Sequence, residues 1–222
     1  DERAGGVIEF DLGAYGMSKG EVTTWEPPMR FGYVERDWMD GAPPVATEIT
    51  ITARSGGQCV VRMVHSLFAA SDDWDDQIEG FEGGWPAFFE VLRIYLTHFA
   101  GQKAASAGAM ARAKGTQLDV WRRLVAKLGL EGANVGEERT TFAGPLRLSG
   151  IVECIRQDRR QRYAILRLTE PGPGVVIAAT HTMGESVNAS ISTYFYGEDA
   201  ARLAAESEPA WQNLVDATST DI

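Results

Sequence analysis

Cysteine is scarce in this sequence, with two residues in a chain of 222. Cys59 and Cys154 lie far apart, and neither has a neighbour at the spacing of a metal-binding pair. The pattern therefore excludes a zinc motif built on cysteine and a disulfide framework of the secreted kind. We expect two unpaired thiols in a reducing compartment, which favours the cytoplasm.

Several other signals are missing as well. No segment reaches the roughly 18–20 apolar residues of a membrane-spanning helix, and no leader-like start is visible. The sequence also lacks a Gly-rich phosphate loop, a His/Cys/carboxylate ligand set and a paired acid–base motif. The acidic run at 72–82 has neither the spacing nor the glycine of a calcium loop. We therefore expect no cofactor, no metal and no membrane partner.

Positive charge is sparse in the first half. Residues 1–101 hold 17 acidic and 7 basic residues, a balance of −10, whereas residues 102–222 hold 14 of each. An acidic surface repels the phosphate backbone of nucleic acids. The charge distribution therefore argues against a nucleic-acid partner.

One long apolar segment dominates the first half. Between Gly80 and Gln102, large side chains recur at spacings of three and four, which predicts an amphipathic helix. Gly83-Gly84 should break the chain before this helix, while Pro86 suits its first turn and Gly101 its end. The predicted apolar face contains Trp85, Phe88, Phe89, Val91, Leu92, Tyr95, Leu96 and Phe99.

Five segments ahead of this helix alternate between apolar and polar residues, as half-buried strands do. They cover residues 6–12, 21–25, 30–35, 45–53 and 59–68. A glycine-rich loop at 13–20 and a hairpin turn at 55–57 separate some of them, and the short connections favour an antiparallel meander. Alternation places one apolar set, with a histidine, on a common face: Ile8, Phe10, Phe31, Tyr33, Ile49, Ile51, Met63 and His65.

The second half repeats this order in outline. A loose stretch rich in Ala, Gly and Ser at 102–115 places a domain boundary near residue 102. The segments after it read as a helix at 117–129, strands at 138–143, 146–156, 163–168, 174–183 and 187–196, and a helix at 198–217. Each half thus runs strands and then a helix, which favours the α+β class. We expect two domains, 1–101 and 102–222.

Some local features of the first half form a known combination. Gly5-Gly6 open the first strand, Pro27-Pro28 close a Gly-x-Val strand, His65 sits in an apolar strand, and Gly84-Trp85 start the long helix with its Leu-x-x-x-Leu. Residues 4–101 thereby resemble the activator of heat-shock-protein ATPase homologue family, inside the SRPBCC (START-like, birch-pollen-allergen-like) superfamily. Through SGIVE, YAILRL and STYFYG, the second half more weakly resembles a divergent domain of the same type.

The resemblance implies a helix-grip fold, in which a curved antiparallel sheet wraps a long C-terminal helix and a hydrophobic cavity lies between them. Domains of this family begin with a strand and two short helices, whereas this chain starts at the second strand of that pattern. We therefore expect an open edge on the first sheet and a cavity without its lid. The missing part would lie upstream, or be replaced by another part of the chain or by a second copy.

Our first hypothesis is that the chain binds a small hydrophobic molecule in this cavity, without a defined catalytic activity. The expected lining residues are Ile8, Phe10, Phe31, Tyr33, Ile49, Ile51, Met63, His65, Trp85, Phe89, Leu92 and Tyr95.

Two alternatives stay open. The chain could be a cyclase- or hydrolase-like enzyme, as some relatives in the superfamily are, with His65 as acid or base and Tyr33 or Arg62 assisting. It could instead be a stress-response protein that binds a chaperone or regulator, as the family name implies. A histidine in an apolar setting is also often a core residue bonded to backbone or water. The sequence leaves homodimer formation open.

Gly16 to Gly20 match the G-x-S-x-G pattern of a nucleophile elbow. That motif needs a strand, a sharp turn and a helix, and here a strand follows. We therefore interpret these residues as a hairpin loop.

Overall fold

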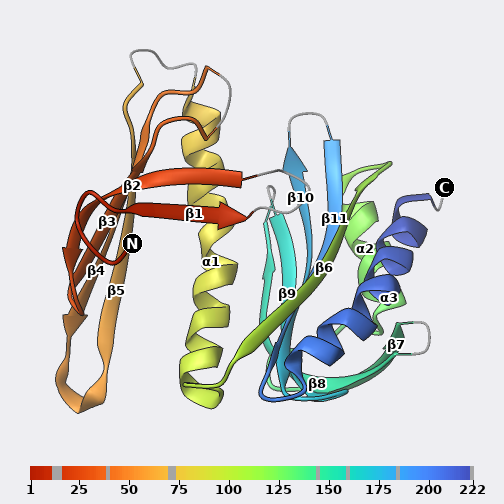
Figure 1. Ribbon diagram of the computed structural model, residues 1–222. Helices are drawn as coiled ribbons and strands as arrows, with labels where there is room; N and C mark the ends of the chain where they lie inside the picture. Colours follow the sequence, from red (N-terminus) through yellow and green to blue (C-terminus); the bar gives the residue numbers. More distant parts are fainter. Residues whose placement is uncertain are drawn as a thin grey trace. The chain divides into compact units, whose positions relative to one another are not determined.

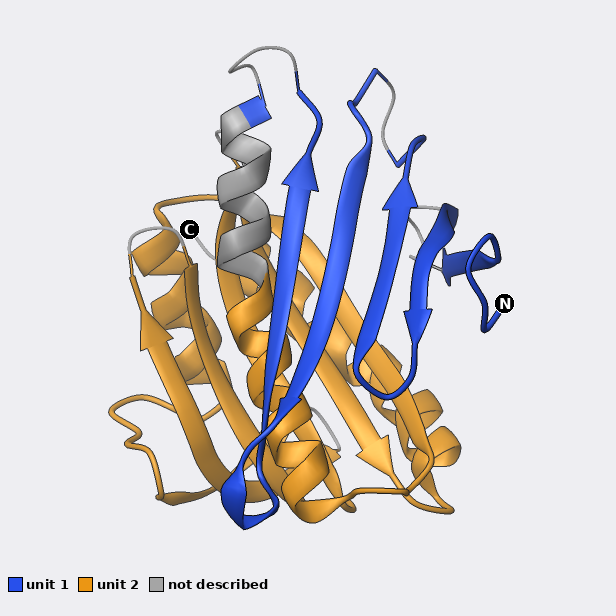
Figure 2. Cartoon of the chain, turned by 90° about the vertical axis from the view of Figure 1, so that its left-hand side faces the viewer, with its two compact units in different colours: residues 1–82 blue, residues 83–222 orange. Residues whose placement is uncertain are grey.

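The computed structural model describes residues 1–11, 17–38, 41–69, 74–143, 146–158, 161–183 and 186–220 (Figure 1). The chain divides into two compact units, Asp1–Glu82 and Gly83–Ile222 (Figure 2). Each unit is described by itself. In the described part of the chain, no helix combines the length and the apolar character needed to cross a bilayer.

The first unit holds a five-stranded antiparallel sheet whose spatial order follows the chain. Its strands are β1 (Val7–Asp11), β2 (Met17–Glu26), β3 (Arg30–Glu35), β4 (Val45–Ala53) and β5 (Cys59–Leu67). The predicted meander is confirmed. The turn between β4 and β5 works because Gly56 and Gly57 have φ of 77° and 72°, a region that favours glycine.

Strand β2 starts earlier than the sequence predicts. Met17–Gly20 belong to the strand, so the predicted loop at 13–20 is wrong for these four residues, and residues 12–16 lie outside the described part. Gly20 lies within the strand, close to neighbouring side chains, and not in a turn. A Cβ at this position would lie 3.0 Å from the Ile8 side chain and 3.2 Å from the Tyr33 ring.

The second unit holds a curved six-stranded antiparallel sheet in the order β6-β11-β10-β9-β8-β7 (Figure 1). Its elements are β6 (Ala104–Ala113), α2 (Gln117–Lys127), β7 (Glu138–Ala143), β8 (Leu146–Gln157), β9 (Gln161–Glu170), β10 (Gly174–Met183), β11 (Ser186–Tyr196) and α3 (Ala200–Thr220). The α+β class is confirmed, and each sheet is followed along the chain by a long helix, α1 or α3.

The sequence predicts a loose stretch at 102–115, and the structure shows that this prediction is wrong for most of it. Residues 104–113 form β6, which pairs with β11 over ten consecutive residues. Small side chains are an advantage here, because the alternate alanines of β6 pack on the core that α3 covers. Alanine has a low strand propensity, so the tertiary contacts override the local preference.

Helix α1 (Asp75–His98) also differs from the prediction. It begins before Gly80 and runs through Gly83-Gly84 and Pro86, so the predicted break and start are wrong. The division between the two units therefore falls inside the helix, after Glu82. A division by compactness does not test the sequence boundary near residue 102, and the domains 1–101 and 102–222 stay a prediction.

The face of α1 that packs is not the one with the largest side chains. Ala87, Val91, Ile94 and Phe99 are buried against the six-stranded sheet, on Tyr163, Ile165, Val175, Ile177 and Tyr196. Three members of the predicted stripe remain substantially exposed, namely Phe88 (48%), Leu92 (37%) and Leu96 (54%). At ~100° of rotation per residue, this stripe lies roughly opposite Ile94. The helix thus has two apolar faces.

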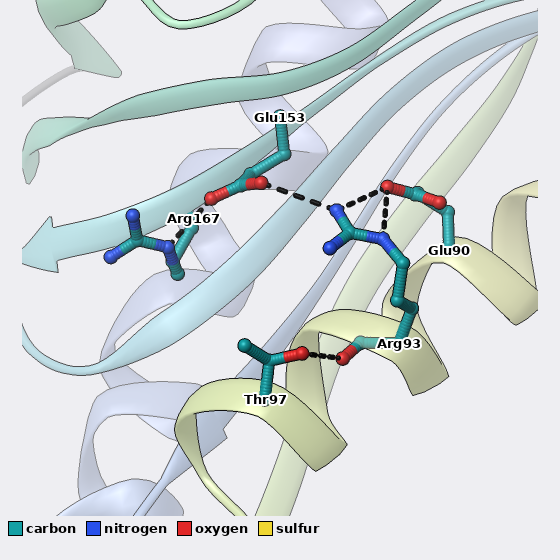
Figure 3. Close-up of polar contacts among 5 residues, drawn as sticks. All are labelled: Glu90, Arg93, Thr97, Glu153 and Arg167. Atoms are coloured by element: carbon teal, nitrogen blue, oxygen red, sulfur yellow. Dashed lines mark hydrogen bonds and ion pairs between the residues drawn. The ribbon is translucent and has the colours of Figure 1, made fainter. Parts of the chain in front are cut away.

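An ion-pair network fastens α1 to the same sheet (Figure 3). Arg93 pairs with Glu90 on its own helix and with Glu153 on β8, whose carboxylate is 3.3 Å away. Glu153 also accepts a 2.7 Å hydrogen bond from Arg167 on β9. Burial raises the pKa of Glu153, but the two guanidinium groups outweigh it, and the net pKa is lowered.

On the opposite face of this sheet, α2 and α3 cover a dense core. Leu124, Phe195 and Trp211 are all fully buried in it. The second unit therefore has three layers, with α1 on one side of the sheet and α2 and α3 on the other (Figure 1).

We predict that Ile94→Ala destabilises the protein by ~2–5 kcal/mol, because Ile94 is fully buried between α1 and the sheet. Leu96→Ala is the matched control on the exposed side of the same helix, and we expect a change within about 0.5 kcal/mol. Urea unfolding followed by circular dichroism measures both. Equal losses would contradict the packing described for α1.

Candidate functional site

The register of the first sheet gathers eight of the predicted site residues on one face. Directly opposed residues of an antiparallel pair lie on the same face. Phe31 opposes Ile49, Ile49 opposes Met63, and Tyr33 and His65 both oppose Thr47. We call this side of the sheet the inner face. The predicted members on it are Ile8, Phe10, Phe31, Tyr33, Ile49, Ile51, Met63 and His65.

Four aromatic rings form a continuous row across the inner face. Ring centroids are 5.6 Å apart for Trp25 and Phe31, 5.5 Å for Phe31 and Tyr33, and 5.4 Å for Phe10 and Tyr33. These spacings are those of favourable aromatic contacts. The row gives a flat apolar object an extended surface to lie on.

Trp25 lies on the inner face, although the sequence does not predict it as a site residue. Strict alternation from Val22 would turn Trp25 to the other face. A register shift between Val22 and Thr24 inserts an extra residue, so Trp25 opposes Phe31 and joins the inner face. Such bulges redirect side chains and have no clear sequence signal here.

A small polar cluster interrupts this apolar surface. The Thr47 hydroxyl lies 2.9 Å from Nδ1 of His65, and Thr47 is 2% exposed. Burial lowers the pKa of His65, so its imidazole is neutral at pH 7. Burial raises the pKa of Tyr33, which the hydrogen bond with Thr47 partly offsets and the charge of Glu35 reinforces. The cluster therefore offers neutral hydrogen-bonding groups.

Ser18 does not serve as a nucleophile elbow. It lies within β2, which continues to Glu26 and is followed by β3, so no strand–turn–helix is present. Its buried hydroxyl donates a hydrogen bond to the carboxylate of Glu35. Gly16, the first residue of the motif, lies outside the described part of the chain.

Arg62 cannot assist His65 in catalysis, as the enzyme hypothesis from the sequence expected. It opposes Thr50, and its place in β5 is one residue from Met63, so it lies on the outer face. Among the described residues, no group of His, Cys, Asp and Glu could hold a metal ion. Cys59 is an exposed free thiol and Cys154 a half-buried one.

The inner face is hollowed near the end of β2. A depression of about 160 Å³ is lined by Trp25, Pro27, Pro28, Arg30, Phe31, Ile49 and Ile51. This volume is below the ~300–1,000 Å³ of typical ligand pockets. The hollow alone would hold only part of a ligand.

The four predicted site residues on α1 belong to the second unit. Trp85 stacks near Phe89, with ring centroids 6.2 Å apart. Tyr95 lies 5.4 Å from Tyr196, and its hydroxyl accepts a hydrogen bond from the Gly101 amide. That Trp85, Phe89, Leu92 and Tyr95 share one site with the inner face stays a prediction.

The interior of the second unit is a poorer site. Its hollow measures about 100 Å³, bordered by residues of α2, the following loop, β8 and β9. Bulky side chains, among them Trp211 and Phe195, occupy the space between sheet and helices.

The comparisons with known proteins give a family match for the first part of the chain. Residues 1–97, which hold the five-stranded meander and most of α1, match the family model described as "Activator of Hsp90 ATPase homolog 1-like protein". This part of the chain is therefore similar to that family. The resemblance read from the sequence is thereby confirmed, and with it a helix-grip fold in two modules. A comparison with curated protein sequences gave no match.

Three of the solved structures to which this chain is similar differ widely from it in sequence. DynU16, from the dynemicin biosynthetic locus, is 16% identical, with a TM-score of 0.35 over 97% of this chain and 85% of its own. The di-domain ARO/CYC BexL from the BE-7585A biosynthetic pathway is 13% identical, with a TM-score of 0.35 over 97% and 88%. MLL2253 from Mesorhizobium loti is 13% identical, with a TM-score of 0.40 over 53% and 100%. Similarity at this level carries no argument about function.

We predict that His65 titrates below its usual pKa of 6.5, because burial disfavours the imidazolium. The unfolded chain then binds the proton more readily, so His65 lowers the stability of the fold as pH falls through 6.5. NMR titration of the imidazole measures the pKa, and unfolding at several pH values measures the stability. His65→Gln should flatten this dependence. A His65 pKa above 6.5 would contradict the described burial.

Proposed function

We propose that this chain binds a small hydrophobic molecule on the inner face of the five-stranded sheet. The observation that carries the proposal is the row of four aromatic rings beside the cluster of Tyr33, Thr47 and His65. Apolar surface with a few placed polar groups is what small-molecule sites use. Rings would bind the body of the ligand, and the cluster would orient one hydrogen-bonding group.

The ligand class follows from the groups present. The cluster is neutral near pH 7, so it suits a carbonyl or hydroxyl better than a charged group. The hollow by Trp25 would take one end of the molecule. The predicted site residues on α1, namely Trp85, Phe89, Leu92 and Tyr95, stay part of this proposal. A cytoplasmic location stays part of this proposal.

We predict that native mass spectrometry of the purified protein detects a co-purifying small molecule, and that the uncharged fluorescent probe Nile red competes for the same surface. Ile51→Lys should weaken probe binding at least about tenfold, since it puts a charge on the inner face. Thr52→Lys, one residue away on the outer face, is the control and should bind normally. Equal binding by both variants would overturn the proposal.

The polar cluster can be tested separately. Tyr33→Phe keeps the ring and removes the hydroxyl, so a ligand that hydrogen-bonds there should bind about fivefold more weakly. Naphthalene, which has no hydrogen-bonding group, should bind the variant and the parent protein alike, whereas 2-naphthol should not. The same loss for both probes would mean that the substitution changed the fold and not the contact.

An enzymatic role is the second candidate, favoured by the contact between Thr47 and His65. A neutral imidazole oriented by a hydroxyl is suited to act as a general base. In this case Tyr33 would assist and Arg62 would not. Turnover of cyclisation or hydrolysis substrates that survives His65→Gln unchanged would remove this candidate.

A third candidate is binding of a chaperone or regulator, which the description of the matched family suggests. The acidic first half would favour a basic partner surface. This role predicts salt-sensitive binding, whereas binding of a hydrophobic ligand should change little with salt.

A further inference from the structure

Two buried hydrogen-bonding groups in the second unit face each other without a partner. Arg162 on β9 is directly opposite Thr180 on β10, on the side of the sheet that α2 and α3 cover. Thr180 is fully buried, and its hydroxyl forms no hydrogen bond to a described residue. The Nε of Arg162 is also buried and also forms none. Buried polar groups are nearly always paired, so this site calls for an acceptor that the described residues do not supply.

The guanidinium group of Arg162 has one edge free. Its Nη1 donates to the side-chain oxygen of Gln157 at 3.1 Å, and this is its one hydrogen bond within the described part of the chain. On α1, Arg93 uses the edge formed by Nε and Nη2 to bind the carboxylate of Glu90. The same edge of Arg162 meets no described carboxylate. A guanidinium edge of this kind matches the two oxygens of a carboxylate.

The small hollow of the second unit lies beside Arg162, because Gln157 is one of its lining residues. Gly132 and Gln157 are exposed and border its mouth. Of the described lining residues none belongs to α3, so this hollow differs from the cavity between sheet and C-terminal helix that a helix-grip fold implies. The buried side chains that line it are those of Trp121, Val125, Leu130, Val152 and Ala164.

We propose that the second unit binds a short aliphatic carboxylate at Arg162 and Thr180, with its alkyl tail in this hollow. The carboxylate would accept two hydrogen bonds from the free edge of Arg162 and one from the Thr180 hydroxyl. The hollow measures about 100 Å³, and a water molecule occupies about 30 Å³, so the tail would have about three or four carbon atoms. Such a tail would cover apolar side chains that an inorganic anion would leave in contact with water. The proposal does not depend on the ligand proposed for the inner face.

Butyrate and its neutral analogue butyramide test this site in the full chain by isothermal titration calorimetry. We expect saturable binding of butyrate and at least about tenfold weaker binding of butyramide, which lacks the charge that pairs with Arg162. Arg162→Gln should weaken butyrate binding at least about tenfold, and Thr180→Val about threefold to fivefold. Arg156→Gln is the matched control and should bind normally, because Arg156 lies on the opposite face of the sheet and pairs with Asp158.

Two results of the titration would overturn the proposal. The first is binding that stays unchanged in Arg162→Gln and Thr180→Val. The second is no saturable binding of butyrate, which would mean that a water molecule is the acceptor for the two groups.

NMR of the ¹⁵N-labelled parent protein locates the ligand even if Arg162→Gln fails to fold. Butyrate should shift the Nε signal of Arg162 and the indole signal of Trp121, which lines the hollow. Trp211 is the control, because its indole is fully buried on α3 and does not line the hollow. Sulfate, which has no tail, should leave the Trp121 signal in place. Equal shifts of the Trp121 signal by sulfate and butyrate, or no shift by butyrate, would overturn the proposal.

Discussion

The strict alternation of side chains along paired strands is the constraint on which the candidate site depends. A slip of one residue in any pair would send the apolar set to the opposite face. The register holds Phe31, Ile49 and Met63 in line across three strands. It also brings Thr47 between Tyr33 and His65, so the polar cluster is produced by strand pairing and not by a loop. The described turn residues that border the site are Pro27 and Pro28, at the hollow by Trp25.

Much of the sheet could be predicted because apolar and polar residues alternate in the sequence of its strands. Ile49 and Ile51, separated by Thr50, show the period of two without a structure. The prediction fails where the period changes within a strand. The register shift between Val22 and Thr24 moves Trp25 to the inner face. No residue type at these positions predicts the shift.

Helix α1 shows a second limit. The sequence shows a broad apolar surface on this helix. The stripe with the largest side chains is therefore predicted to be the buried face. The structure buries Val91 and Phe99 of that stripe, but it adds Ala87 and Ile94 and leaves Phe88, Leu92 and Leu96 exposed. Which of two apolar faces meets which surface depends on tertiary contacts. The same reason explains β6, where alanines that suggested a linker allow α3 to pack near the strand.

The Glu153 carboxylate links α1 to the sheet through Arg93 and Arg167. Because the two guanidinium groups lower its pKa from the ordinary 4.5, this carboxylate is charged at neutral pH. Mild acidification therefore leaves the ion pairs between the helix and the sheet in place, and the contact is set by apolar packing and by charges that do not titrate near neutral pH.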